Sequence, residues 1–127
     1  MNDAVSRGMT YFRFAASHFW PAEQNSSFLK SSADEAKYWK RMDELFSDAE
    51  VLNVTLIPSL NWCLFLWPDL AREPLRELFT NSSSKSSQLL KVYVQKFVRR
   101  YESSTAVLAW ELGRIANTGL QFISSYW

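Results

Sequence analysis

The order of short apolar segments and long helical patterns is the feature that most limits how this chain can fold. Strand-like composition, rich in aromatic and aliphatic residues, occurs at residues 9–16, 54–62 and 107–113. A long stretch with a helical pattern separates each segment from the next, so tight hairpins cannot join them. We therefore expect an α/β fold with about three parallel strands and two long crossover helices.

Each helical pattern places apolar side chains at steps of three and four residues. The first begins with the capping-box spacing of Ser32 and Glu35 and continues through Tyr38, Met42, Leu45, Phe46, Ala49 and Leu52. The second begins near Ser87 and continues through Leu90, Tyr93, Val94, Phe97, Val98 and Tyr101. Prolines between the second strand and this helix predict a long loop with one short helix over residues 74–79.

Alternation of side chains along the strands sorts each strand into one apolar face and one mixed face. Arg13 and Glu111 both fall on mixed faces, with small residues around them. Helices over one face and a mixed opposite face favour a barrel over a doubly covered sheet. If these strands are close, the two residues form a buried ion pair. That pair either only satisfies two buried charges or also organises a site.

Composition limits the partners of the chain. Its 127 residues allow one domain, and 14 basic against 13 acidic side chains give a formal charge of +1. This balance gives no reason to expect a nucleic-acid or membrane partner. The single cysteine, Cys63, excludes an intrachain disulfide and a cysteine-rich zinc site. No signal peptide or membrane span is visible, so we expect a soluble chain of unknown compartment, without cofactor or metal.

The segment VLAWELGRIAN, residues 107–117, carries a family resemblance. It resembles the fourth strand of clan A glycoside hydrolases, (β/α)8 barrels that include family 5 cellulases and endo-β-mannanases. That strand typically reads W-E-L-G-N-E-P-N, and its last glutamate is the general acid/base. TYFRFAASHFWP looks like the second strand of these barrels and VTLIPSLNW like the third. The matching residues are Trp110, Glu111, Leu112, Gly113 and Asn117.

The same resemblance locates a defect. Arg114 stands where the family has asparagine, and Ile115 stands where it has the acid/base glutamate. Isoleucine cannot transfer a proton, whereas hydrolysis by the usual route needs two carboxylates. The family's nucleophile comes from the seventh strand, and these 127 residues reach only the fourth. We therefore predict no catalytic residue in this chain, and Glu111 lies too deep along its strand to replace the missing one.

Three functional hypotheses follow. The first is a single-domain incomplete glycoside hydrolase-like barrel, a fragment or degenerate copy of an enzyme acting on β-linked polysaccharide such as mannan or glucan, with little or no activity alone. The second is a non-catalytic carbohydrate-binding or self-assembling half-barrel, in which identical copies complete the barrel. The third is an unrelated parallel α/β domain, with Arg13 and Glu111 on opposite faces of the sheet.

The candidate contacts to a polysaccharide or oligosaccharide lie at predicted strand ends and in the loops that follow. Tryptophan rings stack on sugars but are also common in cores, so both roles stay open. A lone histidine is a poor indication of a metal site but a possible hydrogen-bond partner for a sugar. We expect substrate contacts from Arg13, His18, Trp20, Asn61, Trp62, Trp67 and Asn117, supported by Trp110 and Glu111.

Three glycosylation sequons also occur, at Asn25-Ser26-Ser27, Asn53-Val54-Thr55 and Asn81-Ser82-Ser83. Such matches arise easily by chance in a serine-rich sequence. The sequence alone therefore gives none of them weight.

Overall fold

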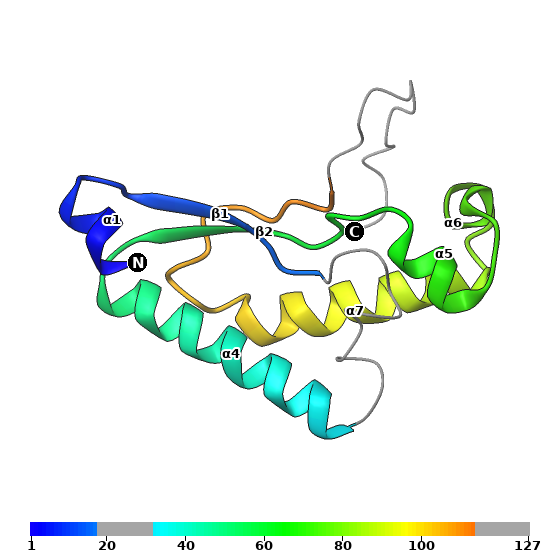
Figure 1. Cartoon of the computed structure of the whole chain (residues 1–127), viewed down its shortest axis with the longest axis horizontal. Helices are drawn as coiled ribbons and strands as arrows, with labels where there is room; N and C mark the ends of the chain where they lie inside the picture. The colour runs from blue at the N-terminus through cyan, green and yellow to red at the C-terminus, as the bar shows by residue number, and fades with distance from the viewer. Residues whose placement is uncertain (18–31, 114–127) are drawn as a thin grey trace.

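A computed structural model describes residues 1–17 and 32–113 of the chain. The described part is an α/β structure with parallel strands, as expected (Figure 1). In chain order its elements are α1 (Asn2–Ser6), β1 (Tyr11–Ala15), α4 (Ser32–Val51), β2 (Thr55–Ser59), α5 (Leu66–Ala71), α6 (Leu75–Thr80) and α7 (Lys85–Tyr101).

The strands β1 and β2 pair in parallel, with Tyr11 opposite Thr55 and Ala15 opposite Ser59. The segment predicted as the third strand runs along the other side of β2, where Figure 1 draws it in orange. It is held there by two isolated parallel bridges, not by a continuous ladder. The predicted order of parallel segments is therefore present, with β2 in the middle and its third member irregular.

The irregularity has its origin at Pro58. Leu56 lies opposite Val107 and Ser59 opposite Glu111, so three steps along β2 match four along the third segment. The backbone of Leu56 both donates to and accepts from this segment, at 2.6 and 2.9 Å. Pro58 only accepts, from the Glu111 N–H at 3.1 Å, because proline has no N–H to give. One extra residue, as in a β-bulge, is accommodated where that donor is missing.

The extra residue changes which side chains of the third segment reach the core. Strict alternation predicts Leu108 on the apolar face and Val107 on the mixed face. Instead Val107 packs against the core with Trp110, whereas Leu108 is 55% exposed. The predicted faces are therefore wrong at the start of this segment and right at Trp110 and Glu111.

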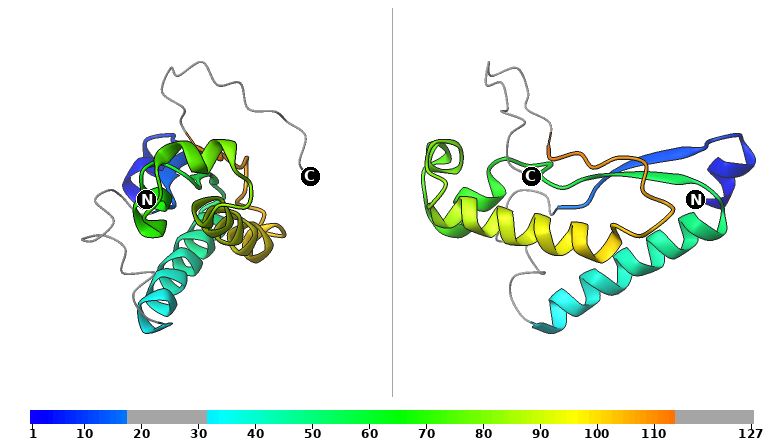
Figure 2. Two further views of the ribbon diagram at one scale, coloured as in Figure 1. Left: turned by 90° about the vertical axis from the view of Figure 1, so that its right-hand side faces the viewer. Right: turned by 180° about the vertical axis from the view of Figure 1, so that it is seen from behind.

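Helices α4 and α7 cover the same face of the sheet (Figures 1 and 2). Their aromatic side chains form much of the core: the Phe46 and Tyr101 rings stack with centroids 3.8 Å apart, and Phe97 is fully buried. At the edge of this interface Arg100 donates two hydrogen bonds to Asp43, at 2.7 and 2.6 Å. Neither helix reaches the opposite face of the sheet, which carries Arg13.

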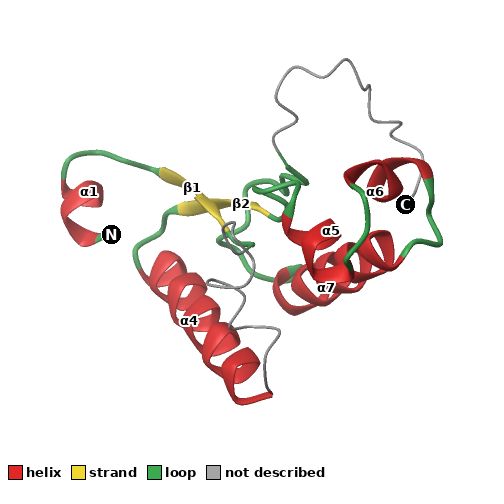
Figure 3. Cartoon of the chain, turned by 45° about the vertical axis from the view of Figure 1, so that its right-hand side comes forward, coloured by secondary structure: helices red, strands yellow, loops and turns green. Residues whose placement is uncertain are grey.

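The connection from β2 to α7 contains more helix than predicted. It holds two short helices, α5 and α6, where the sequence predicts one (Figure 3). Pro68 lies in the first turn of α5, where a backbone N–H would have no intrahelical partner. Helix α7 begins at Lys85, before the predicted Ser87, because the Ser84 side chain caps it by accepting from the Ser87 N–H at 3.1 Å.

Candidate functional site

Arg13 and Glu111 meet on the sheet face opposite α4 and α7. The guanidinium Nε donates to one Glu111 carboxylate oxygen at 2.6 Å, and its terminal nitrogen donates to the other at 2.6 Å. Such a bidentate pair is geometrically specific and stronger than a neutral hydrogen bond. It holds Glu111 as a charged acceptor, so this carboxylate is not set up to deliver a proton.

The strands determine where this pair lies. Arg13 of β1 stands opposite Ile57, and Glu111 stands opposite Ser59, so both side chains rise from the same face on either side of β2. The side chains remain 38% and 26% exposed. The pair is thus partly open to solvent, which corrects the prediction of a buried pair. Water screens it, so its contribution is geometric more than energetic.

Trp62 lies next to this pair, just beyond β2. The Arg13 guanidinium carbon is 5.0 Å from its ring centroid, within the range of a cation–π contact. The Trp62 backbone N–H donates to the Ser17 hydroxyl at 3.0 Å, and this hydrogen bond joins the segments that follow β1 and β2. Trp62 is only partly buried, so its ring belongs to the surface of this end of the sheet.

The structure adds Ser59 and Ser17 to this site, although the sequence did not indicate either as a site residue. Ser59 shares the face of Arg13 and Glu111, is fully buried, and its hydroxyl has no hydrogen-bond partner. A buried hydroxyl without a partner is uncommon and is normally satisfied by water or a ligand. Alternation along β2 places Ser59 on the mixed face, so the sequence pattern could have indicated it as a site residue. Ser17 had no comparable signal.

Two predicted contacts belong to the core instead. The Trp67 indole N–H donates to the Asn61 side-chain oxygen at 2.9 Å. Trp67 is 2% exposed and Asn61 is 5% exposed, and the Trp67 ring packs against Tyr93. Neither side chain can reach a ligand in this arrangement. The tryptophan is structural because its one polar atom is satisfied by a neighbouring amide.

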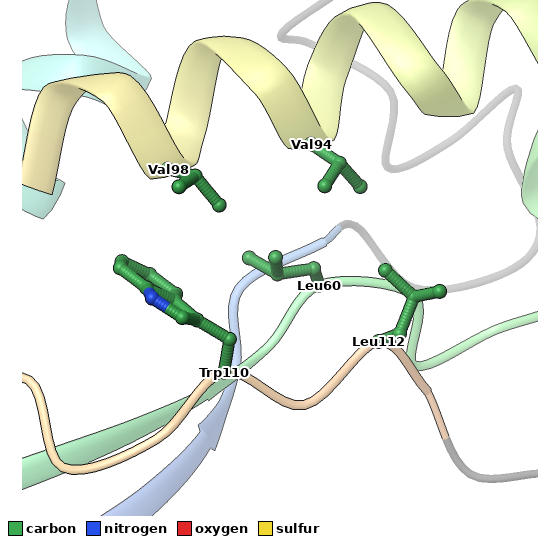
Figure 4. A pocket seen from close by; sticks show the side chains of 5 residues that line it. All are labelled: Leu60, Val94, Val98, Trp110 and Leu112. Atoms are coloured by element: carbon green, nitrogen blue, oxygen red, sulfur yellow. The ribbon is translucent and has the colours of Figure 1, made fainter. Parts of the chain in front are cut away.

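Trp110 supports the site from the opposite side. Its ring contacts Phe97 edge to face, 6.2 Å between centroids. It also lines an apolar hollow of about 280 Å³, into which two valines of α7 point (Figure 4). The hollow lies on the helix side of the sheet and contains no titratable side chain, so it offers no acid–base chemistry. Its lining residues are Leu60, Val94, Val98, Trp110 and Leu112.

The remaining predicted residues lie outside the described part of the chain. These are the substrate-contact candidates His18, Trp20 and Asn117, together with Ile115 at the acid/base position. Of the nine predicted site residues, the structure brings together Arg13, Glu111 and Trp62.

Within residues 1–17 and 32–113, no three histidine, cysteine, aspartate or glutamate side chains cluster as metal ligands would. No helix of that part is long and apolar enough to cross a membrane. The polar group around Glu111 on the face of the sheet opposite α4 and α7 consists of the ion pair with Arg13, the Trp62 indole and the buried Ser59 hydroxyl. Charged, indole and hydroxyl groups of this kind can bind hydroxyl-rich molecules.

No protein-family model matches this chain, and no curated protein sequence matches it.

Proposed function

We propose that this chain is a glycoside hydrolase-related partial (β/α)8 barrel that contacts β-linked polysaccharide, such as mannan or glucan, without hydrolysing it on its own. The observation that carries this proposal is the Arg13–Glu111 pair on the open sheet face. The two residues are 98 positions apart, and both were selected from the resemblance and from strand alternation. Their pairing puts both side chains on one face of the sheet, where two inward-facing residues of a barrel would also lie.

The coverage of the sheet supports the same proposal. Barrels carry helices only on the outside, with an inner face that becomes polar toward its functional end. In the described residues, α4 and α7 pack on one face (Figure 2), and the Arg13–Glu111 pair lies on the other. The hydrogen bonds between Arg13 and Glu111 place both side chains on one face of the sheet, whereas the hypothesis of an unrelated domain expects them on opposite faces.

The lack of hydrolysis follows from the chemistry of the residues. Retaining and inverting glycosidases both need a carboxylic acid that protonates the leaving oxygen. The matching position is Ile115, a hydrocarbon. Glu111, the nearest carboxylate in that strand, is engaged by Arg13 through both oxygens.

Release of reducing sugar from mannan and from cellulose tests the catalytic half of the proposal. The purified 127-residue chain is incubated with each polymer beside an active mannanase and an active cellulase as positive controls. We expect no release above a blank over the time in which the controls exhaust their substrate. Turnover that disappears in Glu111→Gln would contradict the proposal, because it would make Glu111 catalytic.

The second candidate is a self-assembling half-barrel, and the open sides of the sheet favour it. In the described residues, large hydrophobic side chains are exposed near both sides: Met9 just before β1 and Tyr11 at its first position, and Leu108 and Leu112 in the third segment. Unpaired strands with exposed apolar residues tend to pair with another chain. Light scattering decides this: a monodisperse dimer supports self-assembly, whereas a monomer excludes it.

A further inference from the structure

The turn between α6 and α7 carries the sequon Asn81-Ser82-Ser83. All three residues are exposed. The Asn81 side-chain oxygen accepts a hydrogen bond from the Ser83 N–H at 3.0 Å, which closes an Asx-turn over the sequon. Asn81 itself has an extended backbone, with φ of −131° and ψ of 95°. The local fold therefore presents the asparagine and the serine two positions later together on a solvent-exposed turn.

The reacting nitrogen of Asn81 is also accessible. It donates one proton to a Glu77 carboxylate oxygen at 3.1 Å, in a hydrogen bond that is exposed to solvent. The amide carries a second proton on the same nitrogen. Attachment of a sugar needs only one N–H to be lost, so the modified amide keeps one proton. Its oxygen also remains free to accept from Ser83, so the turn tolerates the modification.

The sequon at Asn53 contrasts with this arrangement. Asn53 has φ of 52° and lies in the turn between α4 and β2, and Val54 is 3% exposed. Thr55 is the first residue of β2, and both its N–H and its hydroxyl donate to the Thr10 carbonyl, at 3.0 and 3.4 Å. A glycosyltransferase could bind this sequon only if the start of β2 separated from the sheet. The third sequon, at Asn25, lies outside the described residues.

We propose that Asn81 is an N-glycosylation site and that the folded chain presents it in preference to Asn53. The co-substrate is an oligosaccharide linked through pyrophosphate to a lipid carrier. The bond from its anomeric carbon to the pyrophosphate oxygen breaks, and a bond from that carbon to Asn81 Nδ2 forms. One amide proton leaves, and the lipid pyrophosphate departs as the leaving group. No oxidation or reduction occurs.

Glycan transfer in vitro tests this proposal. The purified, folded full chain carrying Asn25→Gln is incubated with a single-subunit oligosaccharyltransferase and a lipid-linked oligosaccharide, and glycopeptides are mapped by mass spectrometry. Ser83→Ala removes the hydroxyl of the sequon but keeps the backbone N–H that closes the turn. Thr55→Ala is the matched variant in the other sequon. Circular dichroism checks that each variant is folded.

The expected result is one glycan per chain, on Asn81. It falls at least tenfold in Ser83→Ala and is unchanged in Thr55→Ala. Absence of a glycan on Asn81, or a glycan on Asn53 of the folded chain, would overturn the proposal. Both outcomes are independent of whether the chain binds polysaccharide.

Discussion

At the scale of single residues, Gly113 shows why the W-E-L-G segment needs its glycine. A Cβ built at this position would lie 2.5 Å from the backbone oxygen of Asn61. No side-chain rotation relieves such a contact, because the obstacle is main chain. The glycine therefore lets the third segment pass close to the chain that leaves β2.

We expect Gly113→Ala to destabilise the fold by about 2 kcal/mol, because backbone must shift to admit the methyl group. Gly8→Ala is the comparison: Gly8 has φ of 88° but nothing within 4 Å of the added carbon. That variant should cost about 1 kcal/mol, from backbone conformation alone. Chemical denaturation of both variants measures the difference. Equal losses would mean that the approach to Asn61 is not tight.

Residue-scale prediction worked best where strand alternation applies. The shared face of Arg13 and Glu111 could be predicted because side chains alternate with a period of two, which leaves few alternatives once the strands are recognised. Trp67 could not be placed this way. Its indole suits a sugar platform or a core equally, and the Asn61 oxygen that satisfies its N–H is known only from the tertiary structure.

At the scale of elements, the third segment tests the register shift beside Pro58. Val107→Asp should lose at least about 1 kcal/mol of stability, because a carboxylate replaces an isopropyl group packed on the core. Leu108→Asp should change stability by less than about 0.5 kcal/mol, because Leu108 is largely exposed. Urea denaturation of the two single variants compares them. A larger loss of stability in Leu108→Asp than in Val107→Asp would contradict the extra residue and would support strict alternation along this segment.

Sequence reasoning predicted the existence of this segment but not its register. Strand recognition depends on composition, which is local. The extra residue instead depends on which strand lies beside Pro58 and on which side its missing N–H points, and both are tertiary facts. Helix α5, the short helix that the sequence did not predict, has a related explanation. Pro68 was interpreted as part of a loop, although proline is tolerated in the first turn of a helix.

Helix α7 depends on a carboxylate from outside its own sequence. Glu73 accepts from the backbone N–H groups of Lys85 and Ser86, at 3.0 and 2.9 Å, and from the Ser86 hydroxyl at 2.8 Å. The backbone hydrogen bond from Ser86 is the main cause that lowers the pKa of Glu73 from its ordinary 4.5. Because the pKa of Glu73 is lower in the folded than in the unfolded chain, its charge stabilises the fold at pH above the unfolded-state pKa. This stabilisation is lost as the pH falls through the folded-state pKa.

Glu73→Gln should therefore lower Tm near neutral pH, and the difference from the parent chain should shrink as pH falls below 4.5. Glu102→Gln, at the opposite end of α7, removes an exposed glutamate as the control and should not lower Tm. Thermal melts across this pH range provide the measurement. A difference that stays constant with pH would show that the Glu73 charge does not stabilise α7.

At the scale of the whole molecule, the two faces of the sheet differ: α4 and α7 cover one, and the Arg13–Glu111 pair lies on the other. Alternating strand and helix patterns predicted an α/β chain with parallel pairing, and the structure has both. Closure into a barrel was not predictable from these residues alone, because closure depends on the strands that would flank the open sides. The one-sided helix layer and the polar opposite face are the observations on which the proposed relation to carbohydrate-acting barrels rests.

The most direct test of that connection is calorimetric titration of the chain with β-1,4-linked mannohexaose and cellohexaose. Trp62 stands beside Arg13 at the polar end, whereas Tyr11 is exposed on the same face at the other end of β1. We predict saturable binding of at least one sugar that Trp62→Ala abolishes and Tyr11→Ala preserves. Failure of both sugars to bind, or binding that is undiminished in Trp62→Ala, would contradict the proposed function.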